Sequence, residues 1–373
     1  MSGLTDSRPA VLHVTQAGDG GVGKVVAGLA RFQDREGFRV EVACDPDSPL
    51  AAELAGAGLR VRPWVAARSP VRGVWREAAS LSRIVEQARP DVVHAHSAKA
   101  GLVARLVVRG KVRTVFEPHA WSFWALPDWL AGVGRAWERA ALRWTSRVIC
   151  LSKAEAAAID LGDRAALIPN GVDTDWWCPR DRAESRRRLG VDEDKFLVVC
   201  VARVCWQKGQ DVLIDAFRLL LDEQPGALLT LVGDGPTLPS IRERAAGLPV
   251  LTPGQVADPR DWYAAADLVV LPSRYEGGAL SVLEVGAMER LMVATSVGSV
   301  TDDPALAVLV PSNDPVRLAG VLGWLAEDLD LRTALARSAR RRVLHRYQAD
   351  EAYRRVTELA VPLSCASVEV GVQ

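Results

Sequence analysis

The 373-residue sequence lacks most of the features that mark specialised classes of protein. Its 46 Lys and Arg balance 46 Asp and Glu, so no net charge argues for nucleic acid as a partner. The amino terminus lacks an apolar signal core, and no later run approaches the ~18 apolar residues of a membrane span. The six cysteines, Cys365 among them, form no Cys-x2-Cys pair. We therefore expect a cytoplasmic protein with reduced, structural cysteines.

Apolar runs of strand length alternate along the chain with segments of helical spacing. Strands are predicted at residues 10–16 and 38–44, on either side of a helix at 25–33. This opening predicts a parallel sheet. The pattern restarts at 196–202, after a hydrophilic stretch at 178–189 that we interpret as a linker. The length suits two α/β domains followed by a long terminal helix at about 331–360. The predicted divisions are 1–178, 179–345 and 346–373.

A glycine-rich loop at residues 17–24 follows the first predicted strand. Gly18, Gly20 and Gly23 spell Gly-x-Gly-x-x-Gly, with Asp45 as a candidate ribose-binding acid, which is typical of dinucleotide sites. The same loop spells Gly-x4-Gly-Lys, but Val25 stands where a phosphate-binding P-loop needs Ser or Thr. The loop alone does not choose between these interpretations.

Three histidines lie at the ends of two predicted strands, at residues 91–96 and 114–119. They are His94, His96 and His119. Ligands gather at the carboxyl ends of strands in a parallel sheet, so each is a candidate binding residue. The alternative is a strand-end side chain bonded to backbone. Zinc is a third interpretation, but no further ligand pattern supports it, and we predict no metal site.

Residues 120–145 hold five of the twelve tryptophans. From residue 130 the spacing is helical, which favours an amphipathic helix packed on the core. The loop before it, with Trp121 and Trp124, is also suited to an aromatic wall for a carbohydrate or aglycone. A helix lying on a membrane is the third interpretation, although basic residues are not massed there.

Residues 271–295 have the pattern of a binding loop between a strand and a helix. Gly277 and Gly278 let backbone N–H groups approach a ligand, and the following helix adds its positive end, so the turn suits an anion. Glu276 and Glu284 flank the turn, and they would repel a phosphate. We expect the two carboxylates to accept hydrogen bonds from hydroxyls on either side of it.

The loop at residues 203–209 places two cations between another predicted strand and its helix. Arg203 and Lys208 lie beside the positive end of that helix, where a diphosphate is well stabilised. Together with the Glu-x7-Glu pattern of Glu276 and Glu284 and the Ile-Pro-Asn-Gly-Val-Asp run at 168–173, this Arg-x4-Lys-Gly element resembles glycosyltransferase family 4.

The resemblance implies a GT-B fold, with two Rossmann-like domains whose parallel sheets face across a cleft and a C-terminal helix that returns to the first domain. It implies that Glu276 holds the donor sugar, that Glu284 holds the nucleotide ribose, and that Arg203 and Lys208 bind the leaving diphosphate. His119 would contact the donor's sugar and diphosphate. Further donor-binding residues implied are Gly20, Gly21, Val256, Gly277, Gly278, Ala279 and Leu280. Candidate acceptor-binding residues are His96, Trp121 and Trp124.

The resemblance also implies the reaction: retaining transfer from a nucleotide-diphosphate sugar, most commonly a UDP-sugar, without metal or cofactor. The Ala, Arg and Val richness indicates a high-GC bacterium, which makes a small-molecule acceptor such as an aminocyclitol antibiotic precursor our first expectation. A lipid carrier or polysaccharide acceptor, an NAD-dependent oxidoreductase and a non-catalytic nucleotide-sugar binder are the alternatives. We expect a monomer or homodimer. The segment at 298–303 departs from the family pattern, which weakens any inference about the sugar.

Overall fold

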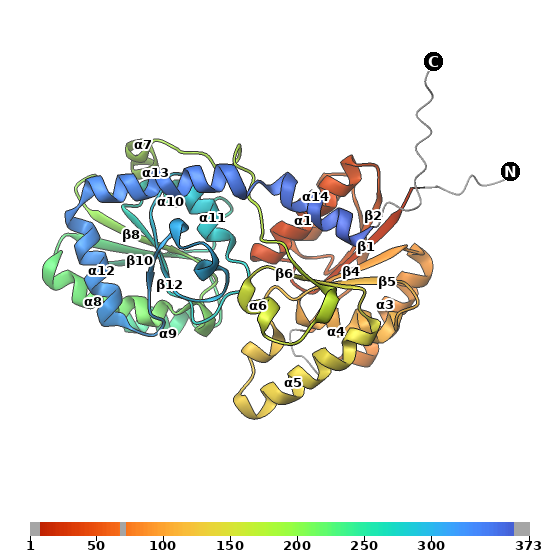
Figure 1. Cartoon of the computed structure of the whole chain (residues 1–373). Coiled ribbons are helices and arrows are strands. Elements are labelled where there is room, and N and C mark those ends of the chain that lie inside the picture. Colours follow the sequence, from red (N-terminus) through yellow and green to blue (C-terminus); the bar gives the residue numbers. More distant parts are fainter. Residues whose placement is uncertain (1–7, 68–71, 362–373) are drawn as a thin grey trace, which may run out of the picture. The chain divides into compact units, whose positions relative to one another are not determined.

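The computed structural model describes residues 8–67 and 72–361, so Cys365 lies outside the described residues. The chain forms two compact units. One contains the described residues up to Pro169 together with those from Asp350 onward, and the other runs from Asn170 to Ala349. Each unit has its own parallel sheet with helices on both faces (Figure 1). Within the described residues, no helix is both long enough and apolar enough to cross a membrane.

The first sheet has the strand order β3-β2-β1-β4-β5-β6-β7. Its inner strands are short, mostly apolar and buried, as is typical of parallel sheets covered by helices, whereas the edge strands β3 and β7 are partly exposed. They are β1 (Ala10–Thr15), β2 (Arg39–Cys44), β3 (Arg60–Pro63), β4 (Val92–His96), β5 (Arg113–Glu117), β6 (Arg147–Cys150) and β7 (Ala165–Leu167).

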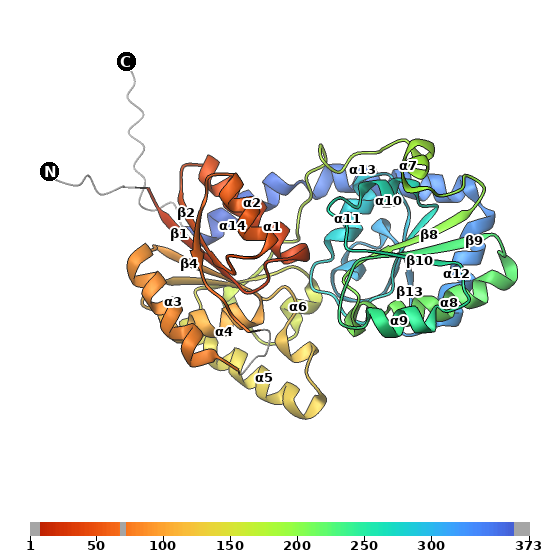
Figure 2. The same cartoon turned by 180° about the vertical axis from the view of Figure 1, so that it is seen from behind.

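Helices from both ends of the described chain cover one face of this sheet. Helix α1 (Gly20–Arg35) and α2 (Pro49–Gly56) pack there side by side (Figure 2). Helix α14 (Ala349–Ala360) packs on the same face through Val356, against Leu29 of α1 and Val11 of β1. The opposite face is covered by α3 (Val74–Ala88) and α4 (Ser97–Val108), and the remaining helices of this unit are α5 (Asp128–Ala141) and α6 (Lys153–Ala157).

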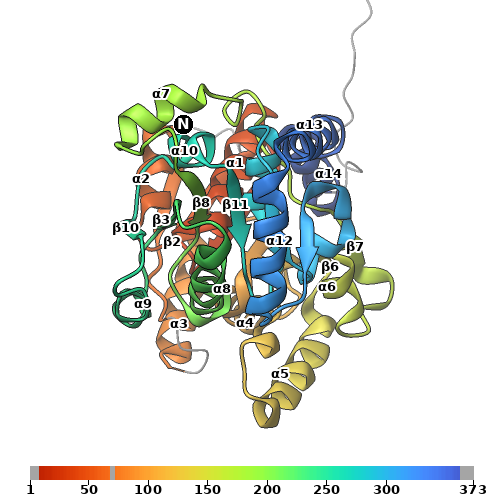
Figure 3. The ribbon, with the colours of Figure 1, turned by 90° about the vertical axis from the view of Figure 1, so that its left-hand side faces the viewer.

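The second sheet has the strand order β10-β9-β8-β11-β12-β13. One face packs against α8 (Gln210–Glu223), α9 (Leu238–Arg244) and α12 (Pro315–Glu327), and Figure 3 shows α8 and α12 side by side. The other face carries α7 (Arg182–Leu189), α10 (Arg260–Ala265), α11 (Leu280–Ala287) and α13 (Leu329–Arg346). The strands are β8 (Phe196–Val201), β9 (Ala227–Val232), β10 (Val250–Gly254), β11 (Leu268–Leu271), β12 (Met292–Thr295) and β13 (Val308–Val310).

Helix α1 begins earlier than the glycine content of the sequence predicts. The loop after β1 ends at Asp19, whose extended backbone precedes the helix, and Gly20 and Gly21 form the first helical turn. Gly20 has a φ of +65°, which a glycine adopts without strain. The predicted loop is therefore shorter, and Gly23 and Lys24 lie in the first turns of the helix.

The predicted long terminal helix is two helices, because the chain breaks between α13 and α14. The Val172 N–H donates to the Tyr347 carbonyl at 2.8 Å, and the Ala349 N–H donates to the Val172 carbonyl at 3.2 Å. These bonds to Val172 replace the intrahelical bonds that a continuous helix would form. The break falls where the chain passes from the second unit to the first.

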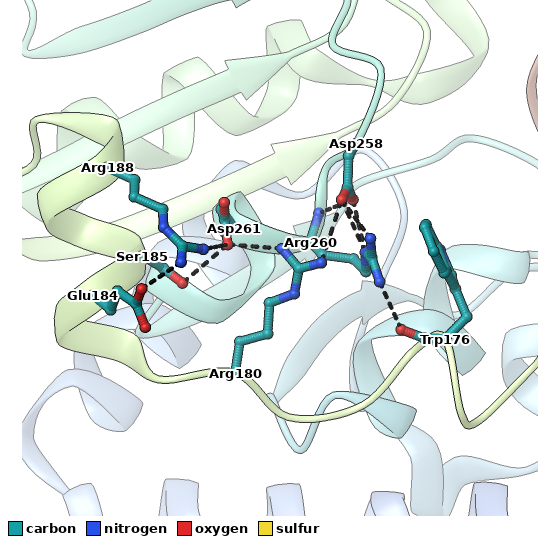
Figure 4. A network of polar contacts seen from close by, with 8 residues as sticks. All are labelled: Trp176, Arg180, Glu184, Ser185, Arg188, Asp258, Arg260 and Asp261. Atoms are coloured by element: carbon teal, nitrogen blue, oxygen red, sulfur yellow. Dashed lines mark hydrogen bonds and ion pairs between the residues drawn. The ribbon is translucent and has the colours of Figure 1, made fainter.

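The prediction of a linker at 178–189 is wrong, because most of this stretch is helix α7. The helix packs on α10 of the second unit. Figure 4 shows the charged network on this side of the unit. Arg180 donates to Asp261 at 2.8 Å, and Arg188 lies 3.5 Å from the same carboxylate. Arg260 lies over the Trp176 ring and binds Asp258. The polar composition of the stretch therefore serves a docked helix.

Candidate functional site

Two loops at the same edge of the second sheet carry the predicted diphosphate and sugar residues. Strands β8 and β11 are parallel neighbours, so their carboxyl ends lie side by side. The loop after β8 holds Arg203 and ends in a short 3-10 turn, Trp206–Lys208, before α8. The loop after β11 holds Glu276 and leads into α11. Topology alone therefore brings Lys208 to Glu276, although they are 68 positions apart.

Lys208 and Glu276 form an ion pair in which both side chains are largely withdrawn from solvent. The Lys208 Nζ lies 2.5 Å from the Glu276 Oε1, with side chains 22% and 6% exposed. The Ser273 Oγ donates to the same oxygen at 2.6 Å, and the Thr295 Oγ1 donates to the Ser273 carbonyl at 2.5 Å. The carboxylate is held from two sides, and the ammonium retains hydrogens for a second acceptor.

Two glycines with left-handed backbone let these loops pack directly against one another. Gly209 has a φ of +67°, and a Cβ there would lie 2.1 Å from the Pro272 carbonyl oxygen. Gly298 has a φ of +53°, and a Cβ there would lie 1.9 Å from the Glu276 carbonyl oxygen. Both contacts are with backbone, which has little freedom to move aside. Glycine is therefore required at both positions to place Glu276.

Hydrogen bonds from residues that the sequence analysis did not assign to the site hold the glycine turn after Glu276 in place. The Ser299 N–H donates to the Gly277 carbonyl at 3.2 Å, and the Ser299 Oγ accepts the Ala279 N–H at 3.0 Å. Asn170 donates its side-chain amide to the Gly278 carbonyl at 3.1 Å. Ala279 was predicted to bind the donor, and in this structure its N–H is bonded to the Ser299 hydroxyl, which an anion would have to displace. Ser299 lies in the segment that departs from the family pattern.

Glu284 lies in α11 and is 5% exposed. The Tyr263 hydroxyl of α10 lies 3.4 Å from the Glu284 Oε2. Burial, together with the charge of Glu284, raises the pKa of Tyr263 well above its ordinary value, so the phenol stays a neutral donor. Leu280 opens the same helix, and Val256 lies half-buried against this face of the core.

Arg203 lies exposed just after β8. Its carbonyl accepts a hydrogen bond from Gln210 at 3.0 Å, which fixes the backbone of the loop. Within residues 8–67 and 72–361, its guanidinium has no hydrogen bond or ion pair. Its charge is therefore available to a ligand, whereas Lys208 is already shared with Glu276.

The first unit gathers four of the five histidines of the chain at the carboxyl ends of β1, β4 and β5. His13, His94 and His96 are fully buried, and the His119 side chain is 5% exposed. The His96 prediction is corrected, because a fully buried ring has no surface to offer an acceptor. His13 was missed by the sequence analysis, although it faces His94 in the register of β1 and β4. Burial lowers the pKa of His13 and of His94 to about 3, so both rings are neutral.

The histidines and Glu117 form two groups that could hold a metal ion. One is His13, His94 and His96, and the other is His96, Glu117 and His119, each with ligand atoms within 4.8 Å of one another. Neutral imidazoles and a carboxylate are suitable zinc ligands. The predicted absence of a metal stays a prediction.

The tryptophan-rich segment is only partly buried: Trp121 lies in the core, whereas Trp129 is 77% exposed. Trp121 is 1% exposed, and its Nε1 donates to the Glu155 carbonyl at 2.8 Å. Its ring stacks on Phe123 with centroids 5.5 Å apart. The prediction that Trp121 binds the acceptor is therefore wrong, because neither face of its ring is exposed to solvent. Trp124 is half-buried and meets Phe123 edge-on.

Comparison with known proteins agrees with this architecture. The model described as Glycosyltransferase Family 4 matches residues 19–176, and the one described as Glycosyl transferases group 1 matches residues 195–328. The chain is 31% identical to a D-inositol 3-phosphate glycosyltransferase of Frankia alni, over 86% of this chain and 89% of that protein. It is 36% identical to the lipopolysaccharide core biosynthesis mannosyltransferase LpsB of Rhizobium meliloti, over 44% of this chain and 50% of that one.

Solved structures show the same fold. Anabaena HepE, solved in complex with UDP and glucose, superposes with a TM-score of 0.80 at 21% identity, over 93% of this chain and 98% of that one. The sucrose-phosphate synthase of Thermosynechococcus elongatus also gives a TM-score of 0.80 at 21% identity, over 94% and 98%. Family, relatives and fold agree, and the chain belongs to glycosyltransferase family 4 as a glycosyltransferase of the GT-B fold.

Proposed function

We propose that the enzyme transfers a sugar from a UDP-sugar to a hydroxyl of a small cyclitol-like acceptor, with retention of the anomeric configuration and without a metal ion. The observation that carries this proposal is the Lys208–Glu276 pair at the start of α8, with the exposed Arg203 on the same loop. One cation neutralises the carboxylate and still offers hydrogens, and the other is unpaired among the described residues. Such a loop suits a sugar joined to a diphosphate.

In this proposal the chain's residues act on the leaving group and not on the acceptor proton. The bond between the sugar carbon and the diphosphate oxygen breaks as a bond to the acceptor oxygen forms on the same face. A diphosphate oxygen takes the acceptor's proton. Arg203 and Lys208 stabilise the charge that develops on the diphosphate. Glu276 accepts hydrogen bonds from donor-sugar hydroxyls, and its pairing with Lys208 keeps its orientation fixed.

The acceptor class is supported by the relatives. The Frankia alni protein is named for D-inositol 3-phosphate, a phosphorylated cyclitol, and its similarity spans most of both chains. An aminocyclitol shares the ring of vicinal hydroxyls and belongs to the same chemical class. The similarity to the mannosyltransferase LpsB supports a second candidate, a lipopolysaccharide sugar as acceptor, over about half of each chain.

Calorimetric titration of the protein in EDTA with UDP, GDP, ADP and NAD tests the donor. We expect UDP alone to bind with micromolar affinity, and Arg203→Ala to abolish that binding. NMR of the product from a UDP-sugar and an inositol phosphate or aminocyclitol then reports the anomeric configuration and the acceptor. Binding of NAD alone, or an inverted product, would overturn the proposal. Turnover only with lipopolysaccharide fragments would select the second candidate.

Replacing Glu284 with alanine is expected to weaken UDP binding about tenfold, the effect of losing one charged hydrogen bond to the ribose. With 2′,3′-dideoxy-UDP, which lacks the hydroxyls, Glu284→Ala should have little effect. Calorimetry with both ligands closes the thermodynamic cycle. Glu243→Ala, at an exposed position of α9, is the control. Equal losses with both ligands would remove Glu284 from the ribose.

Replacing Gly298 with alanine is expected to lower kcat/KM by about 10²-fold, because the new Cβ must push the Glu276 loop out of place. Gly247→Ala is a matched control: its φ is +78°, and nothing lies within 4 Å of the added Cβ. Both variants suffer the left-handed strain of about 1–2 kcal/mol, but only Gly298→Ala displaces the loop. Steady-state kinetics compares them, and equal activities would show that the Gly298 contact does not place Glu276.

A further inference from the structure

Three of the buried histidines of the first unit form a single file of hydrogen bonds with residues of two helices. The His119 Nε2 lies 3.1 Å from the His96 Nδ1, and the His96 Nε2 lies 3.0 Å from the His13 Nδ1. The His13 Nε2 lies 2.8 Å from the Gln33 Oε1 in α1. The file ends in α14, where the Gln33 Nε2 lies 3.2 Å from the Thr357 Oγ1.

The α14 end of this file has a fixed direction. The Thr357 Oγ1 lies 2.8 Å from the Tyr353 carbonyl oxygen, one helical turn earlier. A carbonyl oxygen only accepts, so the Thr357 hydroxyl donates its one hydrogen to Tyr353. Towards Gln33 the hydroxyl therefore accepts, and the side of the Gln33 amide that faces Thr357 is the NH2 group. The amide oxygen of Gln33 then faces His13.

The direction passes from ring to ring because a neutral imidazole has one donor nitrogen and one acceptor nitrogen. His13 donates from Nε2 to Gln33, so its Nδ1 accepts. His96 therefore donates from Nε2, and its own Nδ1 accepts from the His119 Nε2. The rings are neutral, since burial lowers the pKa of His13 to about 3 and lowers those of His96 and His119 from their ordinary value.

Glu117 lies beside two rings of the file. Its Oε1 lies 3.5 Å from the His119 Nε2, which favours a hydrogen on that nitrogen. Its Oε2 lies 3.5 Å from the His96 Nδ1 and 3.3 Å from the His94 Nε2, and makes no hydrogen bond. The His96 Nδ1 is closer to the His119 Nε2, at 3.1 Å, so the hydrogen bond within the file and not Glu117 sets the tautomer of His96.

We propose that Thr357 and Gln33 are positioning residues that fix His119 as the Nε2–H tautomer and so present its Nδ1 as a hydrogen-bond acceptor for a substrate hydroxyl. A neutral acceptor nitrogen attracts the hydrogen of a hydroxyl and repels a phosphate oxygen. His119 therefore binds a sugar hydroxyl and not the diphosphate. This role rests on the proposed function, because it takes the substrate to be a sugar. The tautomer itself does not depend on the substrate.

NMR of the full chain labelled with [15N]histidine reads each tautomer directly. There are five histidines, of which His345 is exposed and lies outside the file, and single substitutions assign the signals. We expect pyrrole-type Nε2 and pyridine-type Nδ1 signals from His13, His96 and His119. A pyrrole-type Nδ1 on any of the three, or signals that change with EDTA, would overturn the file, since a metal-bound nitrogen carries no hydrogen.

Thr357→Val tests whether Thr357 sets the direction of the hydrogen bonds in the file. Valine has nearly the shape of threonine but gives the Gln33 NH2 no acceptor. We expect the amide to turn and a population with Nδ1–H rings to arise in all three histidines together. Thr357→Ser, which keeps the hydroxyl, should retain the wild-type spectrum. An unchanged spectrum in folded Thr357→Val would overturn the role of Thr357.

The kinetic consequence separates this inference from the proposed function. Thr357→Val should raise the KM for the donor sugar about tenfold, the effect of one lost hydrogen bond, and leave UDP affinity unchanged. A reversed tautomer with an unchanged KM would refute the contact of His119 with a substrate hydroxyl. If no UDP-sugar is a substrate at all, the proposed function fails, and the wild-type spectrum still decides the tautomer.

Discussion

Replacing Lys208 with alanine is expected to lower kcat by about 10²–10³-fold, the effect of removing one preorganised donor from a developing oxyanion. Lys208 lies in the turn that begins α8, and its ammonium is already oriented by Glu276 at 2.5 Å. No reorganisation is then needed when charge develops on the leaving diphosphate. Single-turnover kinetics with a UDP-sugar measures the chemical step apart from product release.

The loss must be separated from the effect of leaving Glu276 unpaired, since Glu276 is buried. The double variant Lys208→Ala with Glu276→Gln removes the unpaired charge and should stay as slow as Lys208→Ala alone. Lys195→Ala, at an exposed position before β8, is the control for losing a lysine from this unit. Wild-type turnover in folded Lys208→Ala would remove Lys208 from the chemistry.

The candidate residues whose positions the sequence predicted best are those that follow strands. Lys208 and Glu276 each follow an apolar run, and parallel neighbours bring such loops together whatever their distance along the chain. Ser299, Tyr263 and Asn170 were missed, because they reach the site from other loops and helices. No local pattern assigned them a contact with the site, although Asn170 belongs to the run at 168–173 that carries the family resemblance. Contacts of this kind are set by packing, which no spacing rule encodes.

The fold shows the same division between local and long-range information. The strands were predicted close to where they lie, because a buried parallel strand is an apolar run. The break between α13 and α14 was missed, because it is made by hydrogen bonds to Val172, far away in sequence. Trp121 was misjudged because sequence records that a ring is large and apolar, but not whether its face is covered.

Helix α7 is the clearest example of a feature that the local sequence did not predict. It leads to the prediction with the largest effect on stability. Replacing Arg186 with alanine is expected to lower the free energy of unfolding of the second unit by about 3–5 kcal/mol, the range for breaking a buried ion pair. The Arg186 side chain is fully buried and binds Asp267 at 2.7 Å. It also donates to backbone carbonyls, those of Asp192, Glu193, Lys195 and Ala265.

This effect has a local readout and a matched control. Hydrogen exchange of β8 and β11 reports the opening of the second unit in the full chain, whereas exchange of β1 and β4 in the first unit should not change. Arg187→Ala removes a neighbouring arginine that is 66% exposed, and should cost little. Arg186→Lys should recover only part of the stability, because one ammonium cannot reach the acceptors that a planar guanidinium bonds together. Equal exchange in Arg186→Ala and Arg187→Ala would mean that the stretch behaves as the linker its composition predicts. A selective loss would show that one buried arginine makes a hydrophilic segment part of the domain that carries Lys208 and Glu276.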